Sequence, residues 1–175
     1  KIVPTSTDIA HLSHEFGFQL SGIKDRIDLC VEFADYANPQ FDFIKVNTQS
    51  LIRDKMICHF AKKVFVFVSS EDYNTHLPRI PIEVSRFGIE MIEKELSGMG
   101  EAKIRTSKGE KVKTLETNYI IDLKLDKRFD FEDLDFKLKH IPGVLETGLF
   151  SNCTDKLFTV HQKAKTIKQE HNRVR

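Results

Sequence analysis

The run VFVFV at residues 64–68 constrains the fold more than any other feature of the chain. It is short, uncharged and made of β-branched and aromatic residues, which is typical of a strand buried on both faces of a sheet. A second apolar run of strand type occupies residues 27–31, and residues 50–62 place apolar side chains at helical spacing between the two runs. The order strand, helix, strand predicts a βαβ crossover and a parallel sheet.

The composition changes at residues 77–81, LPRIP, which we interpret as a hinge into a second unit. Beyond the hinge we expect a strand at 81–84, a helix whose apolar face carries Met91 and Leu96, two strands at 102–106 and 119–125, a helix capped by Asp130, and a strand at 144–150. The order βαββαβ is that of a ferredoxin-like unit. A further strand, KLFTV at 156–160, is expected to return to the first sheet.

The predicted fold class is therefore α/β, with a Rossmann-like parallel-sheet unit and an inserted ferredoxin-like α+β unit. The first unit is expected to comprise residues 1–78 plus 155–168, and the second residues 81–150. The first unit should open with a short helix capped by Ser6 or Thr7 and ended by Gly17. We interpret residues 169–175 as a basic, solvated tail rather than a nucleic-acid arm.

Charge and composition narrow the classes of partner. The formal net charge is +1, so no overall field attracts nucleic acid or a membrane surface, and no nucleic-acid partner is expected. No apolar run approaches the ~20 residues of a membrane span, and no signal peptide is visible, so we expect an intracellular protein. Fourteen Phe and no Trp favour packing and contact surfaces over hydrogen-bonded recognition.

The cysteines and histidines predict neither a metal nor a cofactor. Cys30, Cys58 and Cys153 are an odd number with wide spacing, and we interpret them as buried reduced thiols rather than as a disulfide or a metal site. The seven histidines show no metal spacing with the cysteines. His11 and His14 are three residues apart, but no third ligand stands near them in the sequence.

Five segments resemble type A ribose-5-phosphate isomerase: VPTS (3–6), IDLCVEFADY (27–36), FIKVNTQSLIRDK (43–55), IPIEV (80–84) and IPGVLETGLF (141–150). The resemblance spans about residues 2–168, and its last two segments mark the fold rather than the chemistry. It implies an enzyme that interconverts ribose 5-phosphate and ribulose 5-phosphate through an enediol. Such a reaction needs a carboxylate base, donors for an oxyanion and a cationic, glycine-lined pocket for phosphate.

The resemblance assigns four candidate catalytic residues. Asp35 and Lys45 match an aspartate and the lysine of the family site, Glu32 replaces a second aspartate, and Asp54 replaces the glutamate that acts as general base. The longer Glu32 and the shorter Asp54 move their carboxylates in opposite directions, and about 1 Å of misplacement can cost roughly a hundredfold in rate.

The residues themselves leave a second interpretation open. Asp35 and Lys45 would also fit an ion pair that only holds the loop between them. Asp54 stands between Arg53 and Lys55, which favours a solvated helix face over a general base.

Other positions depart from the family pattern. Phe33 replaces a glycine, residues 46–48 replace a glycine run that follows the lysine, and Asp72 replaces a second functional lysine. Glycine in such loops permits close approach of backbone N–H groups to a ligand, which a side chain prevents. We also expect the family's Gly-Ser/Thr phosphate loop, which precedes VPTS, to be absent.

These departures predict a degenerate isomerase homologue retained as a protein-binding or structural subunit. The expected partner is another protein or a second copy of the chain, contacted through an uncovered side of the sheet and through Phe33, Phe41 and Phe43. The alternative is a working isomerase of the pentose phosphate pathway, with a sugar phosphate as substrate. By resemblance its location is cytoplasmic, or an organellar matrix if it is recruited to a complex there.

Overall fold

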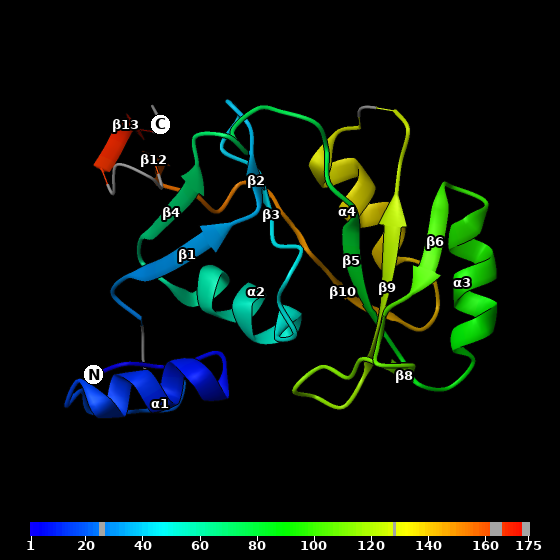
Figure 1. The fold of residues 1–175 in the computed structure, drawn as a ribbon, viewed down its shortest axis with the longest axis horizontal. Helices are drawn as coiled ribbons and strands as arrows, with labels where there is room; N and C mark the ends of the chain where they lie inside the picture. The colour runs from blue at the N-terminus through cyan, green and yellow to red at the C-terminus, as the bar shows by residue number, and fades with distance from the viewer. Residues whose placement is uncertain (25–26, 128, 162–165, 173–175) are drawn as a thin grey trace.

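The first of two large sheets is parallel over three of its four strands. The computed structural model describes residues 1–24, 27–127, 129–161 and 166–172. The sheet has the order β1 (Cys30–Ala34), β4 (Val64–Ser69), β12 (Lys156–His161) and β13 (Thr166–Asn172), and only β13 runs antiparallel to its neighbour (Figure 1). The predicted parallel sheet and the returning strand are confirmed.

The chain end differs from the prediction. A solvated tail was expected from residue 169, but β13 continues to Asn172 and pairs with β12. The prediction is therefore wrong for residues 169–172, because the exposed edge of β12 offers unpaired N–H and C=O groups with which their backbone pairs. Residues 173–175 lie outside the described part of the chain.

Two helices accompany the first sheet. Helix α1 (Thr7–Glu15) begins at Ser6, whose Oγ accepts a hydrogen bond from the Ile9 N–H at 3.2 Å, and Gly17 follows it with φ of 74°. This confirms the predicted cap and stop. Helix α2 (Leu51–Phe60) makes the crossover between β1 and β4. The strand expected from residue 27 starts only at Cys30, because Ile27 makes an isolated bridge to Ala61 instead.

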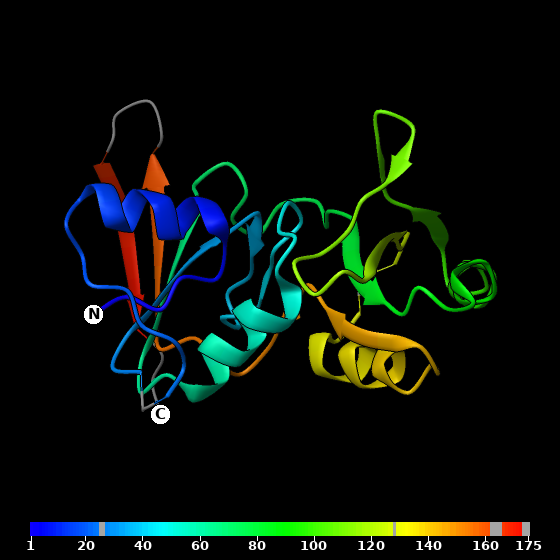
Figure 2. The ribbon, with the colours of Figure 1, turned by 90° about the horizontal axis from the view of Figure 1, so that it is seen from below.

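The second sheet is antiparallel, with the order β10 (Val144–Thr147), β5 (Ile80–Val84), β9 (Tyr119–Lys124) and β6 (Glu101–Ile104). Helix α3 (Ile89–Ser97) packs on β6, helix α4 (Phe131–Lys139) packs on β10, and Asp130 caps α4 as predicted (Figures 1 and 2). A small hairpin, β7 (Thr106–Ser107) with β8 (Glu110–Lys111), extends from it. This strand order is the predicted ferredoxin-like arrangement.

A third, short sheet joins the two large ones. Its order is β11 (Leu149–Phe150), β3 (Phe43–Ile44) and β2 (Tyr36–Ala37). The strand predicted at 144–150 is therefore divided at Gly148. The Gly148 N–H donates to the Pro81 carbonyl at 2.8 Å, and its carbonyl accepts from the Lys45 N–H at 3.1 Å. A Cβ at Gly148 would lie 2.5 Å from Pro81 Cγ and 2.7 Å from the Lys45 carbonyl oxygen, so this approach needs glycine.

The apolar core is divided into two clusters that do not follow the predicted unit boundaries. One cluster lies under the parallel sheet and includes Val66 and Leu157. The other fills the antiparallel sheet and its helices, but it also takes in Tyr36 and Ile44 from the short sheet. The division into residues 1–78 plus 155–168 and residues 81–150 therefore stays a prediction.

Burial differs from the prediction at two elements. In β4, the valines 64, 66 and 68 are buried while Phe65 and Phe67 remain partly exposed, so the strand is sealed on one face only. In α3, Met91 is 70% exposed although its spacing placed it on the apolar face. An apolar side chain such as Phe or Met can lie on a buried or on an exposed face, so residue type alone does not predict burial.

Candidate active site

Three of the four candidate residues meet in one buried cluster. Glu32 comes from β1, Lys45 follows β3, and Asp54 lies in the first turn of α2. Lys45 Nζ is 2.5 Å from Glu32 Oε2 and 2.7 Å from Asp54 Oδ2. The lysine therefore lies between two carboxylates, both of which are buried.

The local sequence explains why these side chains converge. In β1, Cys30 and Glu32 are two residues apart and point to the buried face, whereas Val31 and Phe33 point to the exposed face. Strand alternation places Glu32 in the interior, where Lys45 pairs with it.

The electrostatics of the cluster follow from having one cation for two anions. Burial raises the pKa of the Glu32 carboxyl above its ordinary value, and the nearby Asp54 charge adds to this rise. Burial alone would lower the pKa of Lys45, but attraction to Glu32 and Asp54 outweighs it and leaves that pKa raised. The lysine is therefore firmly charged, and Glu32 is the carboxylate that protonates more readily than usual.

Asp54 is held by more than the lysine. Its Oδ2 accepts a hydrogen bond from Thr48 Oγ1 at 2.7 Å, and its Oδ1 accepts one from Ser50 Oγ at 3.1 Å. With 1% of its surface exposed, Asp54 is not part of a solvated helix face, and that interpretation is wrong. Sequence reasoning missed Thr48 and Ser50, although Ser50 stands four residues before Asp54, a spacing that brings helical side chains together.

Asp35 does not join the cluster. Its Oδ2 accepts hydrogen bonds from the backbone N–H groups of Val46 at 2.6 Å and Asn47 at 3.3 Å, and its Oδ1 accepts one from Asn47 Nδ2 at 2.9 Å. The predicted ion pair with Lys45 is replaced by these contacts, because Lys45 is already engaged by Glu32 and Asp54. Asp35 still holds the loop, but through hydrogen bonds to its backbone.

The same loop is fixed from the second unit. Arg105 donates to the carbonyl of Val46 at 2.9 Å while its guanidinium pairs with Asp122. The Leu115 N–H donates to the Gln49 carbonyl at 3.0 Å. Residues 46–48, which stand where the family has a glycine run, therefore belong to a loop that is held by hydrogen bonds from the second unit. They do not form an open, glycine-lined binding loop.

The aromatic cluster expected near the site is not a surface. Phe43 is fully buried and stacks on Phe150 with ring centroids 4.4 Å apart, and Phe41 is partly buried against the same core. Only Phe33 is prominent, with 71% of its surface exposed and its ring 5.8 Å from that of Phe67. The prediction of a three-phenylalanine contact surface is wrong for Phe41 and Phe43.

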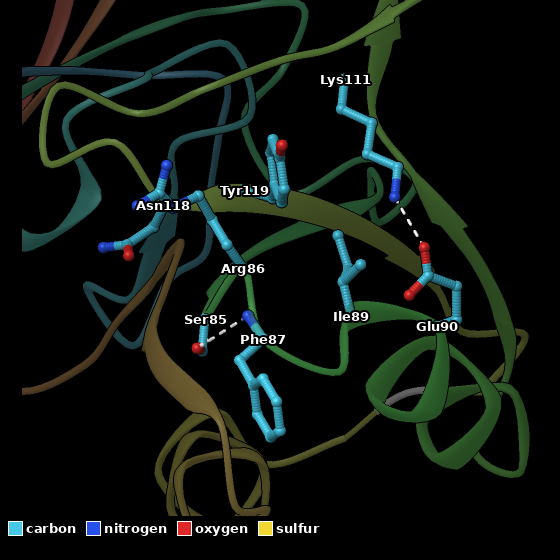
Figure 3. A pocket seen from close by; sticks show the side chains of 8 residues that line it. All are labelled: Ser85, Arg86, Phe87, Ile89, Glu90, Lys111, Asn118 and Tyr119. Carbon is cyan, nitrogen blue, oxygen red and sulfur yellow. Dashed lines mark hydrogen bonds and ion pairs between the residues drawn. The ribbon is translucent and has the colours of Figure 1, made fainter.

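A pocket elsewhere involves none of the four candidate residues. It lies on the second unit and is lined by Ser85, Arg86, Phe87, Ile89, Glu90, Lys111, Asn118 and Tyr119 (Figure 3). Lys111 Nζ pairs with Glu90 Oε1 at 2.7 Å across it. None of its lining residues belongs to the Glu32, Lys45 and Asp54 cluster, so it is separate from the candidate active site.

Metal-ligating side chains gather at one place among the described residues, and it is not at the histidines. His11 pairs with Glu15 at 3.4 Å within α1. The three cysteines are free, and Cys30 and Cys58 are buried, as expected. The thiols of Cys30 and Cys58 lie beside Glu32, close enough for these three side chains to share one metal ion. Across the described part of the chain, no helix has the length and apolarity needed to cross a membrane.

Comparison with known proteins gives a consistent result. The family model of ribose 5-phosphate isomerase A (phosphoriboisomerase A) matches residues 1–164. The chain is 32% identical over 161 residues to ribose-5-phosphate isomerase A of Trichormus variabilis, covering 87% of this chain and 68% of that protein.

Two solved structures share the fold. A D-ribose-5-phosphate isomerase in complex with phospho-erythronic acid superposes with a TM-score of 0.90 at 29% identity, covering 98% of this chain and 77% of the other. Ribose 5-phosphate isomerase from Plasmodium falciparum also gives 0.90, at 23% identity, with 99% and 78% covered. The Rossmann-like α/β description agrees with these structures.

Proposed function

This chain belongs to the ribose 5-phosphate isomerase A family, and on that premise we propose that it is a member whose isomerisation is lost or greatly slowed. In this proposal, the fold is kept for a protein-binding or structural role. The four carried-over residues, Glu32, Asp35, Lys45 and Asp54, are then remnants of a catalytic set.

The burial of Asp54 is the observation that carries the proposal. This residue stands at the position of the family's general base, which must reach a proton on the substrate carbon. Asp54 is 1% exposed, and both of its oxygens accept bonds, from Lys45, Thr48 and Ser50. A carboxylate enclosed in this way is a structural partner of the lysine rather than a base that is open to a sugar.

The surroundings of Asp35 support the same conclusion. Partial desolvation, followed by the charges of Asp35 and Glu71, raises the pKa of the exposed Asp72, which stands where the family has a functional lysine. Negative charge therefore gathers where a phosphate would require positive charge. On the other face of β1, Phe33 adds an exposed ring where the family has a bare glycine backbone.

One observation favours the alternative of a working aldose–ketose isomerase acting on a sugar phosphate. The buried cluster keeps the chemical type of each family residue, with two acids that each lie within 2.7 Å of the lysine. In that case Glu32, Lys45 and Asp54 would be active residues, and a small opening of the loop at 46–50 would admit the substrate.

A coupled assay on ribose 5-phosphate distinguishes the two functions. We expect the purified protein to turn over more slowly than about 1 s⁻¹, the lower edge of ordinary enzymes. The matched variant carries Phe33→Gly, Asp54→Glu and Asp72→Lys, which restore family residue types, and we expect it to be faster than the parent. A parent rate of ~1 s⁻¹ or more that disappears in Lys45→Met, under conditions where circular dichroism shows the variant to be folded, would establish the working isomerase instead.

Exposed apolar side chains support a protein partner or self-association. Ile9, Leu12 and Phe16 on and after α1, and Val31 and Phe33 on β1, are all exposed. Apolar groups gathered on accessible elements are typical of contact surfaces. A measurement of mass in solution tests this role: a monomer that captures no protein from a lysate of its source cell would contradict it. The cytoplasmic or organellar location stays a prediction.

A further inference from the structure

Two buried thiols contact the side of Glu32 that faces away from Lys45. Cys30 Sγ is 3.7 Å and Cys58 Sγ is 3.8 Å from Glu32 Oε1, and the two sulfur atoms are 3.8 Å apart. All three side chains are buried, and their candidate ligand atoms lie within 4.8 Å of one another. Strand β1 supplies Cys30 and Glu32, and α2 supplies Cys58.

These spacings match one face of a tetrahedral coordination site. Zinc–sulfur bonds of ~2.3 Å at a tetrahedral angle put two sulfurs about 3.8 Å apart. A zinc–oxygen bond of ~2.0 Å puts the carboxylate oxygen about 3.5 Å from each sulfur. The observed separations therefore need shifts of only a few tenths of an ångström to become ligand–ligand edges.

The charges also suit a divalent ion. In the metal-free protein both thiols can donate hydrogen bonds to Glu32 Oε1. A divalent cation would replace two thiol protons, so the net charge of the buried cluster would not change. Lys45 stays bonded to the other carboxylate oxygen, Oε2, and would orient the ligand in the manner of outer partners of metal-bound carboxylates.

We propose that Cys30, Cys58 and Glu32 form a buried binding site for a zinc-type divalent ion. Two thiolates and one carboxylate suit zinc or cobalt, whereas magnesium and calcium prefer oxygen ligands only. The sequence predicted three buried thiols. In this proposal two of them, Cys30 and Cys58, are ligands, and Cys153 is a neighbour. Cys153 contacts Cys58 but lies outside the trio of mutually close ligand atoms.

The site would act on the fold and on the charge cluster together. It links β1 to α2, the helix of the crossover, and Lys45 and Asp54 lie in the same crossover. Because its ligands are buried, the ion would be taken up while the chain folds, and its binding would add to the free energy of unfolding.

The test uses the full chain, reduced, stripped of metal and refolded from guanidinium with cobalt(II). We expect roughly one cobalt per chain, with thiolate-to-cobalt charge-transfer absorption and a higher Tm than without metal. In weak buffer, zinc should displace about two protons per ion bound. An unaltered chain that shows no charge-transfer band in excess cobalt would overturn the proposal.

Variants assign the ligands. Cys30→Ser and Cys58→Ser should each abolish the charge-transfer band, and Cys153→Ser should keep it. Loss of the band in Cys153→Ser as complete as in Cys30→Ser would overturn the assignment. If a ligand variant fails to fold by circular dichroism, proton release by the unaltered chain decides: about two per ion supports the site, and one or none overturns it. None of these readouts depends on isomerase activity.

Discussion

The interiors of the two units are filled by different kinds of side chain, charged in one and mainly apolar in the other. The interior of the parallel-sheet unit holds two acids, Glu32 and Asp54, each paired with the same lysine, Lys45. The antiparallel unit is filled by aliphatic side chains such as Ile82 and Leu138. Its buried acid, Glu83, accepts bonds from the neutral donors Thr114 at 2.7 Å and Asn118 at 2.9 Å, and its Oε2 has no partner among the described residues.

The two regions keep family residues for different reasons, one for the packing of an apolar core and the other for the pairing of buried charges. The antiparallel unit carries IPIEV and most of IPGVLETGLF, the segments closest to the family pattern, and its apolar core needs those shapes. The parallel unit carries the altered positions, and its charges persist because removing one partner from a buried set leaves the others uncompensated. Charges retained at a former site can therefore be structural.

The largest expected effect comes from Lys45→Met. It removes the cation that pairs with both Glu32 and Asp54 and should lower the free energy of unfolding by about 3–5 kcal/mol, measured by urea denaturation. Adding Glu32→Gln and Asp54→Asn to this variant should recover part of the loss, because no unpaired charge then remains. Lys103→Met is the control, since that lysine pairs with Glu101 on the surface, and it should leave stability unchanged. A loss below about 1 kcal/mol for Lys45→Met would show that the cluster is not structural.

Leu138→Ala tests the apolar interior of the second unit. Leu138 is fully buried in α4, so its truncation should cost about 3 kcal/mol through lost burial and the cavity left behind. Met91→Ala in α3 is the matched control, because Met91 is 70% exposed and should show almost no loss. Equal losses in both variants would remove the contrast between sealed and open helix positions.

Asp35→Ala should have an intermediate effect. It removes the acceptor of three hydrogen bonds from Val46 and Asn47, and unmade bonds of this kind cost about 1–3 kcal/mol. The loop at 46–50 should also exchange its amide hydrogens faster. Asp72→Ala, an exposed aspartate nearby, should change neither stability nor exchange. If only exchange and not stability changed in Asp35→Ala, the loop would be independent of global folding.

The smallest effect is expected for Phe33→Ser. Its ring is largely exposed and contacts Phe67, so stability should fall by less than about 1 kcal/mol. Phe43→Ser, at a fully buried phenylalanine of the same unit, should cost several times more. Urea denaturation of the two variants compares them directly. Similar losses would mean that Phe33 serves folding rather than contact with a partner.

Periodic apolar patterns explain why the order of elements was predictable. The βαβ crossover, the βαββαβ unit and the return of β12 to the first sheet follow from alternation, helical spacing and caps, which are local properties. The end of the chain was not predictable in this way, because β13 is made mostly of polar residues and pairs with β12 through its backbone. Backbone pairing leaves little trace in side-chain composition.

The site was predictable as a set of residues but not as a set of contacts. Family resemblance identified Glu32, Lys45 and Asp54, and the structure brings them together. The charged neighbours of Asp54 were misleading because adjacent residues on a helix face different directions. Lys55, for example, turns away to contact the Leu149 carbonyl. Sequence spacing also could not show that Lys45 pairs with Glu32 and Asp54 rather than with Asp35. That pairing depends on how β1, β3 and α2 pack together.

The contacts of Gly148 bear on whether the antiparallel sheet can be expressed without the rest of the chain. The N–H and C=O of this one residue bond Pro81 at the start of the antiparallel sheet and Lys45 beside the buried charges, and a side chain at this position would collide with both. A gene cut near residue 79 or 150 would sever that tie and leave Tyr36 and Ile44 without the core into which they pack. We therefore expect that the antiparallel sheet, expressed apart from the parallel sheet, will not keep its native core.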